Sequence, residues 1–281
     1  MKVIQDPRAM HEPSSKRALV ATMGALHEGH LSLMREAKKR CEEVVVSILV
    51  NPLQFSPNED YHNYPRNLER DLELCQSVGV DLVFCPDANV IYPKSFQTQI
   101  SGGELAKQYC GRTRPVFFSG VLTVVNILFH IVKPHKAFFG QKDYQQLCLV
   151  SQMVQDFWMP IEIIAMPTIR EENGLAMSSR NLYLTEAQKK EASCLFQAIL
   201  AVQEAAQCGE CDLRRLLDLA QEKICLEIDY IDIVDWNKEL RLIMAAYVSS
   251  NPKVRLIDNG PVFFMHNPTL DSCISSEPVL G

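Results

Sequence analysis

Two histidines and two glycines lie close together near the start of the chain, in the segment Thr22-Met-Gly-Ala-Leu-His-Glu-Gly-His30. The segment follows an apolar run that predicts a strand and precedes a helical pattern. Free backbone N–H groups and the helix dipole make such a junction favourable for phosphate. His27 and His30 can both donate hydrogen bonds to one phosphate chain, and Gly24 and Gly29 let backbone approach a ligand closely. The segment predicts a phosphate site, with a structural role for the histidines as the alternative.

Two other motifs do not fit this segment. The zinc motif H-E-x-x-H places its histidines four residues apart on one helical face, whereas His27 and His30 are three apart. The chain also has no G-x-x-x-x-G-K-[ST] loop. Zinc and P-loop chemistry are therefore not indicated here.

A lysine occupies a comparable position after another predicted strand, in Gly140-Gln-Lys-Asp143. Lys142 can reach a phosphate as a point charge. Asp143 is as readily the N-cap of the helix that follows. Gln146 lies four residues after Lys142 and so faces the same way on that helix.

Polar side chains in three further segments could hold a ligand. Two hydroxyls and a guanidinium in Ala176-Met-Ser-Ser-Arg-Asn181 suit a mobile phosphate clamp, although such a segment is also an ordinary solvated loop. Gln54, just past the most apolar predicted strand, can donate and accept hydrogen bonds to a small polar substrate. Arg112 and Arg114 could hold a carboxylate or simply face solvent.

The elements that must position these residues alternate between strands and helices. Strands are predicted at 17–21, 43–50, 81–85, 136–139 and 161–166, and helices at 31–41, 68–79, 121–132 and 144–157. This alternation predicts an α/β fold: a Rossmann-like, doubly wound parallel sheet with helices on both faces. Ligands in such folds bind beyond the C-terminal ends of the strands, where the polar loops fall.

The pattern changes after about Leu182. Helices at 185–206 and 212–227 precede strands at 230–234, 242–248 and 254–257, which predicts a smaller C-terminal α+β domain. We predict a Rossmann-like domain over residues 1–175 and a second domain over residues 176–281, with a lid loop at its start. A poorly ordered tail is expected after Gly260.

Composition limits the possible partners and compartment. A net charge of −6 does not favour nucleic acid or an anionic membrane surface. Val116–Val132 is apolar but too short and too polar to span a bilayer, so it predicts a buried helix. The N-terminus has no apolar signal region, and the ten cysteines are scattered, which together predict a cytoplasmic protein with reduced thiols. Cys208 and Cys211 could be half of a zinc or redox site, but nothing nearby completes one.

The segments T-M-G-A-L-H-E-G-H, N-P-L-Q-F, G-Q-K-D-Y-Q-Q-L and M-S-S-R-N-L-Y-L together resemble the pantothenate synthetase (pantoate–β-alanine ligase) family. This family is part of the class I aminoacyl-tRNA synthetase-like nucleotidyltransferase superfamily, and the resemblance runs from about Leu19 to Asn259. It implies ATP-dependent condensation of pantoate with β-alanine through a pantoyl adenylate. It also implies Mg²⁺ bridging phosphate oxygens, with no protein ligand readable, and a homodimer.

The resemblance implies roles for particular residues. ATP would be held by Met23, Gly24, Ala25, Leu26, His27, Glu28, Gly29, His30, Gly140, Gln141, Lys142, Asp143, Ile169, Met177, Ser178, Ser179 and Arg180. Catalysis would rest on His27, His30, Lys142 and Arg180, with His30 the usual acid candidate. Pantoate would be held by Gln54, Gln146 and Arg114, and Gln54 would also meet β-alanine.

The chain departs from the family pattern around residue 117. Where the family often has R-P-G-H-F, this chain has Arg114-Pro-Val-Phe-Phe118, so Phe117 replaces a pocket histidine. Ser119 replaces a frequent arginine, and Val116 replaces a glycine. The loss of an imidazole that could bond a substrate puts affinity or rate in question.

Two other functions are consistent with part of the pattern. One is another nucleotidyltransferase of the superfamily, of the phosphopantetheine adenylyltransferase type, but those chains are generally shorter and lack N-P-L-Q-F. The other is a catalytically weak relative that binds nucleotide as an interaction or regulatory protein. The substitutions at Val116–Ser119 are its only support, and the intact His27, His30, Lys142 and Arg180 argue against it.

Overall fold

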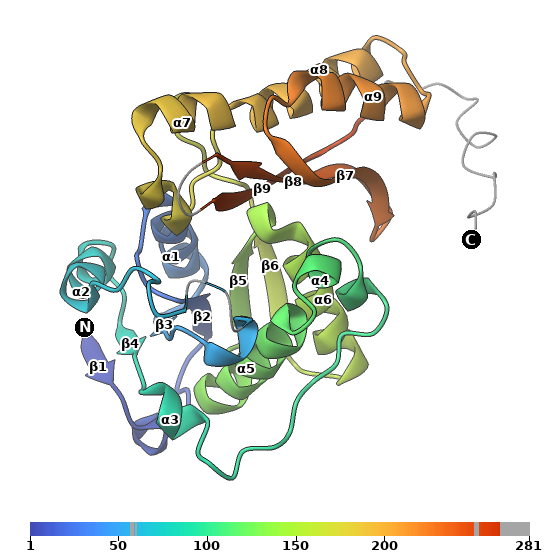
Figure 1. Ribbon diagram of the computed structural model, residues 1–281. Coiled ribbons are helices and arrows are strands. Elements are labelled where there is room, and N and C mark those ends of the chain that lie inside the picture. Colours follow the sequence, from blue (N-terminus) through green and yellow to red (C-terminus); the bar gives the residue numbers. More distant parts are fainter. Residues whose placement is uncertain (57–58, 60, 250–252, 265–281) are drawn as a thin grey trace. The chain divides into compact units, whose positions relative to one another are not determined.

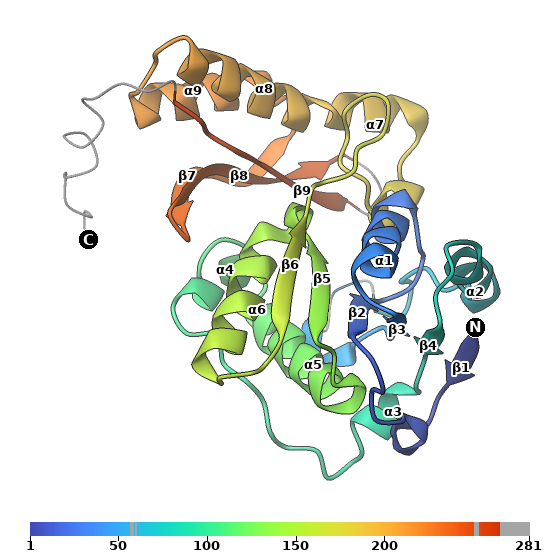
Figure 2. The ribbon, with the colours of Figure 1, turned by 180° about the vertical axis from the view of Figure 1, so that it is seen from behind.

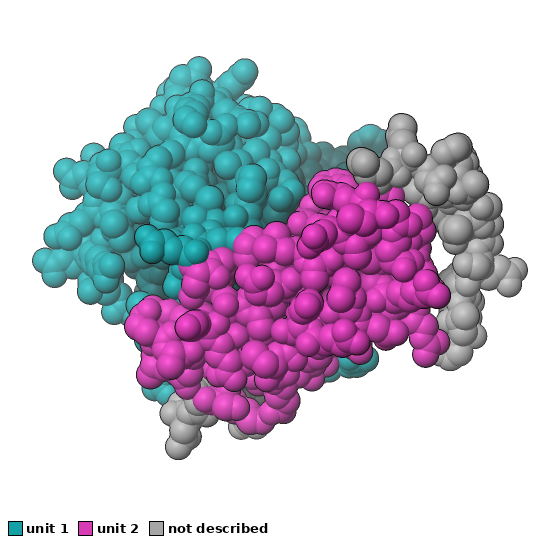
Figure 3. Space-filling view, turned by 90° about the horizontal axis from the view of Figure 1, so that it is seen from above, with its two compact units in different colours: residues 1–172, 176–183 teal, residues 173–175, 184–281 magenta. Residues whose placement is uncertain are grey.

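A computed structural model describes residues 1–56, 59, 61–249 and 253–264. Contacts between Cα atoms divide the chain into two compact units, coloured separately in Figure 3. The first unit contains Met1–Glu172 and Ala176–Tyr183, and the second contains Asn173–Leu175 and the chain from Leu184 onward. The segment predicted as a lid loop of the second domain thus belongs to the first unit. Most of the predicted tail lies outside the described residues.

The first unit is built on a parallel sheet of six strands in the order β1-β4-β3-β2-β5-β6 (Figure 1). The strands are β1 (Lys2–Ile4), β2 (Arg17–Thr22), β3 (Glu43–Ile48), β4 (Leu82–Phe84), β5 (Lys136–Gly140) and β6 (Glu162–Met166). The parallel α/β prediction is confirmed. Strand β1 was not predicted, because three residues at the sheet edge are too short to show a period.

Helices cover both faces of this sheet (Figures 1 and 2). Helices α1 (Glu28–Arg40) and α2 (Leu68–Ser77) lie on one face, and α5 (Phe117–Val132) and α6 (Tyr144–Asp156) lie on the other. Successive side chains of a strand point to opposite faces of the sheet. On β3, Val44 and Val46 point to the same face and pack in one cluster with Met34 of α1. The predicted buried helix is α5, which begins at Phe117, close to the start of the predicted apolar run at Val116 and before the helical pattern at Val121. None of the helices within the described ranges is long and apolar enough to cross a membrane.

Short elements complete the first unit. They are the helices α3 (Ala88–Ile91) and α4 (Cys110–Thr113), and the 3₁₀ turns η1 (Pro7–Ala9), η2 (Pro52–Gln54), η3 (Leu105–Lys107), η4 (Gln141–Asp143) and η5 (Ser179–Tyr183).

The order of the strands fixes where a ligand can bind. From β2 the chain moves to its neighbour β3 on one side, and β5 pairs with β2 on the other side. The crossover helices therefore leave the sheet in opposite directions from β2 and β5, which creates a crevice beyond their C-terminal ends. The segments that follow these two strands are Met23–His27 and η4, two of the places where the sequence predicts phosphate binding.

A buried arginine ties the opposite, N-terminal edge of the sheet together. Arg17 of β2 is fully buried, and its Nε donates to the Glu43 carboxylate of β3 at 2.5 Å. Its Nη1 donates to the carbonyl oxygens of Val132 at 2.7 Å and His11 at 3.0 Å. Removing one partner of such a buried pair is costly because it leaves the other charge uncompensated.

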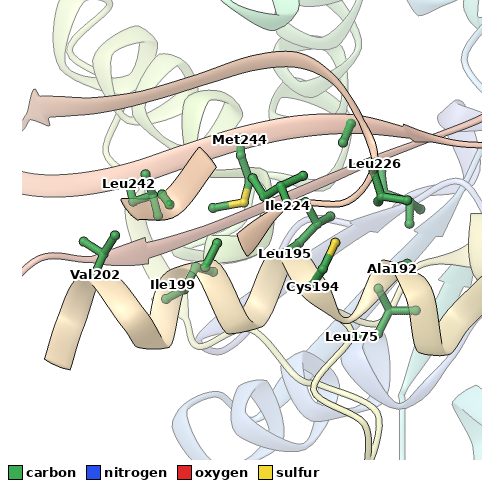
Figure 4. Packing of buried hydrophobic residues seen from close by; sticks show 14 of the residues in the cluster. Leu175, Ala192, Cys194, Leu195, Ile199, Val202, Ile224, Leu226, Leu242 and Met244 are labelled. Carbon is green, nitrogen blue, oxygen red and sulfur yellow. The ribbon is translucent and has the colours of Figure 1, made fainter. Parts of the chain in front are cut away.

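The second unit packs helices on a three-stranded antiparallel sheet in the order β7-β8-β9. Its elements are α7 (Glu186–Ala192), α8 (Cys194–Gln207), α9 (Leu213–Lys223), β7 (Glu227–Trp236), β8 (Glu239–Val248) and β9 (Val254–Pro261). Figure 4 shows Leu195, Ile199 and Val202 of α8 in one cluster with Leu242 and Met244 of β8. The predicted α+β character of this region is confirmed.

The prediction of one continuous helix over 185–206 is wrong, because this segment forms two helices. It is divided between α7 and α8 at Ser193. The Ser193 hydroxyl donates to the Lys190 carbonyl oxygen at 2.7 Å, a local bond that competes with the regular helical pattern.

Candidate active site

The turn between β2 and α1 is held by a buried carboxylate. Gly24 and Ala25 both have left-handed backbone, with φ of 86° and 50°. Asp71 of α2 accepts hydrogen bonds from the N–H groups of Ala25 at 3.0 Å and Leu26 at 2.8 Å. A Cβ atom at Gly24 would lie 2.9 Å from the Asp71 carboxylate, so glycine is needed for this close approach as well as for its φ.

Asp71 was missed by sequence reasoning, although it leaves a signal. Its side chain is 2% exposed, and it lies on the apolar stripe of α2 that also carries Cys75. Burial raises the pKa of the Asp71 carboxyl, while the hydrogen bonds from Leu26 and Ala25 oppose the rise. An acidic residue within an apolar helical stripe indicates a buried acceptor, which here serves the backbone of the turn.

His27 and His30 form the first turn of α1. His27 is the N-cap: its Nδ1 accepts from the Gly29 N–H at 3.2 Å, and its own N–H donates to His30 Nδ1 at 3.3 Å. The ring centroids are 4.1 Å apart. Because both Nδ1 atoms accept, the neutral rings carry their protons on Nε2. Each imidazole is therefore a hydrogen-bond donor through Nε2.

Both imidazoles are neutral at pH 7 in the ligand-free chain. Desolvation, followed by the charge of Lys142, lowers the pKa of His27 to about 4, and Asp143 partly opposes this. Desolvation also lowers the pKa of His30 well below its usual value, with further contributions from His27 and Lys142. An arriving anion would favour the protonated forms and so raise both pKa values. The site thus offers neutral Nε2–H donors, and protonation at Nδ1 would displace the backbone N–H groups that these nitrogens accept.

Lys142 brings the fixed positive charge to this turn. It lies in η4, directly after β5, and its Nζ is 3.7 Å from the Asp143 carboxylate. Its side chain is 19% exposed, so its charge is only partly screened. Asp143 occupies the N-cap position of α6, but its side chain makes no capping hydrogen bond. The N-cap alternative is therefore not supported, and Asp143 remains available to modulate Lys142 and His27.

The segment around Met177 lies beside the histidine turn. The Met177 N–H donates to the Ile169 carbonyl oxygen at 2.9 Å, and Arg170 forms an isolated bridge with Ala176. A Cβ atom built at Gly29 would be 3.9 Å from the Met177 Cβ, so the two segments are neighbours. Met177 therefore lies next to the start of α1 and brings Ile169, its backbone partner, to the same part of the unit.

Of the polar residues that follow Met177, Ser179 and Arg180 both contact an aromatic side chain. Ser179 Oγ and the Tyr64 hydroxyl are 2.9 Å apart, and Tyr64 is 5% exposed. The Arg180 guanidinium lies 6.0 Å from the centre of the Tyr64 ring. The backbone N–H of Arg180 donates to Ser178 Oγ at 3.2 Å. Tyr64 is a second residue that sequence reasoning missed. It fixes the Ser179–Arg180 turn from the loop that follows β3.

Gln54 lies in a tightly constrained turn after β3. Its side chain is 7% exposed, its Oε1 accepts from Asn51 Nδ2 at 3.0 Å, and its Nε2 is 3.1 Å from the Met23 sulfur. The Asn51 amide also donates to the Gly120 carbonyl oxygen of α5 at 3.0 Å. A Cβ atom at Gly120 would lie only 2.3 Å from the Leu53 carbonyl oxygen, so α5 and η2 pack backbone to backbone. Gln54 thus links Met23, which follows β2, to Asn51, which is bonded to α5 on the other face of the sheet.

Arg114 contacts the main chain of Gln54. Its Nε and Nη2 bind the Glu59 carboxylate at 2.6 and 2.8 Å, and its Nη2 also donates to the Gln54 carbonyl oxygen at 3.2 Å. Burial opposes ionisation of Glu59, but the hydrogen bonds and charge of Arg114 outweigh it and lower the pKa of that carboxyl. The guanidinium carbon lies 3.8 Å from the centre of the Phe117 ring.

The side chains of Glu28 and Gln146, both predicted site residues, make no hydrogen bond to the other described residues of this arrangement. Glu28 faces solvent, where its carboxylate pairs with Arg35. The Gln146 side chain makes no hydrogen bond to a described residue. Its neighbour Gln145 is the structural glutamine: Nε2 donates to the carbonyl oxygens of Leu105 and Gln108, both at 2.8 Å, and this fixes η3 on α6. No group of three or more His, Cys, Asp or Glu side chains that could hold a metal occurs in the described part of the chain.

Comparison with known proteins identifies relatives along nearly the whole chain. The family model for pantoate-beta-alanine ligase matches residues 2–261. A pantothenate synthetase from Fervidobacterium nodosum is 48% identical over 250 residues, 85% of this chain and 89% of that protein. One from Thermosipho africanus is 46% identical over 277 residues, 92% of this chain and 99% of that protein.

Solved structures agree with these relatives. Pantothenate synthetase from Thermus thermophilus superposes with a TM-score of 0.88 at 42% identity, covering 94% of this chain and all (100%) of that chain. Pantoate-beta-alanine ligase from Francisella tularensis, complexed with beta-gamma ATP and beta-alanine, gives a TM-score of 0.78 at 36% identity, covering 93% of this chain and 97% of that chain. The likeness therefore extends over both units.

Replacing Asp71 by asparagine should destabilise the turn between β2 and α1. Asparagine keeps one acceptor oxygen but directs an NH₂ group at a backbone N–H that then loses its partner. Leaving a buried donor unsatisfied costs about 1–3 kcal/mol, which urea unfolding would measure. Glu69→Gln, an exposed amide substitution on the same helix, is the matched control. Equal unfolding free energies for the two variants would contradict the anchoring role.

The pKa of His27 should be visible by NMR titration of its ring protons as a midpoint near 4. Because this value lies below the unfolded value of about 6.5, the stability that depends on neutral His27 is present above pH 6.5 and is lost as pH falls towards 4. Lys142→Ala should raise this pKa without restoring 6.5, since desolvation is the larger cause. Asp143→Asn should lower it further. A wild-type midpoint close to 6.5 would show that the ring is solvated.

Proposed function

The chain belongs to the pantoate–β-alanine ligase family, and we propose that its ATP site is the turn between β2 and α1 together with η4 and the Met177–Arg180 segment. The protein joins pantoate to β-alanine at the expense of ATP, releasing pantothenate, AMP and pyrophosphate. The strongest support for this placement of the site is the position of Lys142 relative to the two histidines. The charge of Lys142, which follows β5, acts on both histidines that follow β2, at the crevice where the strand order reverses.

The reaction proceeds, in this proposal, through pantoyl adenylate. A pantoate carboxylate oxygen attacks the α-phosphorus of ATP, and the bond from that phosphorus to pyrophosphate breaks. The β-alanine amine then attacks the acyl carbon, the bond to AMP breaks, and the nitrogen loses a proton. A free carboxylate is a poor electrophile, and AMP is a good leaving group. Two easier displacements thus replace one that would be very slow.

Charge stabilisation on the phosphate side comes from groups that are already in place. The N-terminal N–H groups of α1 and the Nε2–H donors of His27 and His30 lie on one side, and the Lys142 ammonium supplies a full charge. Arg180 and the Ser178 and Ser179 hydroxyls extend the donor set. Preorganised donors of this kind stabilise negative charge that develops in the transition state. His30 is the acid candidate of this proposal: protonation at Nδ1, which displaces the bond from the His27 N–H, would give an imidazolium that can release the Nε2 proton.

The acceptor side is proposed to lie around Gln54. Its amide is oriented by Asn51 and Met23, so it can hold pantoate and approach β-alanine with little loss of side-chain freedom. The Gln146 side chain makes no hydrogen bond to a residue that the structure describes, so a substrate would displace none of those residues. Arg114 is paired with Glu59 and donates to the Gln54 carbonyl oxygen, so its proposed part in holding pantoate is to position Gln54. Ile169 and Met177 are proposed to contact the nucleotide.

Mg²⁺ enters this proposal as part of the substrate MgATP. The described side chains on the phosphate side are mainly cations and neutral imidazoles, which suits a metal ion held by phosphate oxygens and water. A homodimer and a cytoplasmic location complete the proposal. Sedimentation velocity at micromolar concentration tests the dimer, and a monomer throughout that range would contradict it. Cell fractionation tests the location.

The adenylate step has its own assay. The enzyme with MgATP and pantoate, but without β-alanine, should exchange labelled pyrophosphate into ATP. Label from pantoate carboxylate ¹⁸O should appear in AMP after β-alanine is added. Exchange requires that a reversible adenylate form before the amine enters. Exchange that depends on β-alanine, or unlabelled AMP, would refute the two-step route.

Lys142→Ala should lower kcat for pantothenate formation by about 10²–10³-fold, the effect of removing one charge-stabilising donor. Lys133→Ala is the matched control, because Lys133 is exposed at the C-terminus of α5 and pairs with Glu12. Steady-state release of AMP and pyrophosphate would measure both variants. A near-wild-type rate for Lys142→Ala would show that the phosphate site lies elsewhere.

A further inference from the structure

The guanidinium of Arg114 is fixed from three directions. The Glu59 carboxylate binds its Nε and Nη2, the Gln54 carbonyl oxygen accepts from Nη2, and the Phe117 ring faces its central carbon at 3.8 Å. The Arg114 side chain is 14% exposed, so these contacts form its main surroundings. Phe117 is the position at which the family pattern often has histidine.

We propose that Phe117 is a positioning residue for pantoate that acts through Arg114. This inference rests on the proposed function, since it assigns pantoate to the crevice wall that carries Gln54. An aromatic face attracts a guanidinium and restricts its plane. With its plane fixed, Arg114 donates to Glu59 and to the Gln54 main chain in one geometry. The ring therefore helps to set the position of the Gln54 backbone.

The rest of the Gln54 surroundings explain why this contact matters. Asn51 and Met23 orient the Gln54 side chain, and the close packing at Gly120 holds the preceding Leu53 carbonyl. The Gln54 carbonyl oxygen is fixed separately, by Arg114 alone among the hydrogen bonds of the described residues. Loosening Arg114 would let the turn move by a fraction of an ångström. Such small displacements of a positioning group reduce substrate affinity without altering the phosphate site.

Phenylalanine suits this role in a way that histidine does not. A phenyl ring presents a face of negative potential and has no proton to gain. An imidazole beside Arg114 would repel the guanidinium whenever it became protonated, at a pH near its usual value of about 6.5. The substitution exchanges a possible hydrogen bond to substrate for a stacking contact that does not depend on pH.

The test is a set of single variants with a KM measured for each substrate. Phe117→Leu, which removes the ring and keeps an apolar side chain, should raise the KM for pantoate by about three- to tenfold, the range expected for a partly buried cation–π contact. The KM for ATP and kcat should stay within about twofold of wild type because the phosphate groups are untouched. Phe117→Tyr retains the ring and should restore the wild-type KM for pantoate. Val116→Ala, at the exposed neighbouring residue, is the matched control.

A double-variant cycle shows whether the ring works through Arg114. Arg114→Lys loses the stacked, forked guanidinium and should raise the KM for pantoate by itself. Adding Phe117→Leu to Arg114→Lys should then have little further effect. Independent, multiplicative effects of the two substitutions would overturn the inference. Thermal unfolding of every variant separates a loss of positioning from a loss of fold.

The remaining outcomes also decide between the two proposals. A wild-type protein without pantoate-dependent exchange of pyrophosphate into ATP would refute the proposed function itself. An active wild type whose Phe117→Leu variant has an unchanged KM for pantoate, or an equal rise in both KM values, would refute only the role of Phe117. Failure of Phe117→Tyr to restore the KM would do the same.

Discussion

The hydrogen bonds from the backbone of Ala25 and Leu26 to the Asp71 carboxylate are the constraint on which the proposed phosphate side of the site depends. Left-handed backbone at two successive residues is unfavourable, and for Ala25 it persists because a buried acceptor compensates the turn. The turn delivers His27 to the N-cap of α1, where its ring and that of His30 complete a reciprocal cap. A single carboxylate on α2 therefore determines where both imidazoles lie.

The electrostatics of the crevice follow from this placement. Desolvation and Lys142 keep both histidines neutral, so the free chain does not bury three positive charges side by side. A polyphosphate at this turn, as proposed, would oppose the effect of Lys142 on both pKa values, whereas the desolvation that is their larger cause would remain. On the acceptor side Arg114 is already paired with Glu59, which limits its attraction for anions. The two sides of the proposed site thus differ in charge: Arg114 is neutralised by Glu59, and the side that carries Lys142 and the two histidines is the proposed phosphate side.

Much of this organisation was predictable because it depends on short local patterns. A β-branched run such as Glu43–Ile48 indicates a buried strand, and glycine-rich turns after parallel strands indicate a ligand site. The contacts that hold the site were not predictable, because they join residues far apart in sequence. Asp71 is 46 residues from Ala25, and Tyr64 is 115 residues from Ser179. The predicted domain division at residue 176 likewise took no account of the backbone pairing that keeps Met177 with Ile169 in the first unit.

The substitution at Phe117 shows why a departure from a family pattern has to be interpreted with its neighbours. By sequence alone it is a lost imidazole, and therefore a lost hydrogen bond to substrate. In the fold the ring covers a guanidinium that is already held by Glu59 and that itself holds the Gln54 main chain. The relevant chemistry at residue 117 is then the polarisable face of the side chain, which phenylalanine retains. Whether such a change weakens an enzyme depends on which property of the original residue the surrounding groups use.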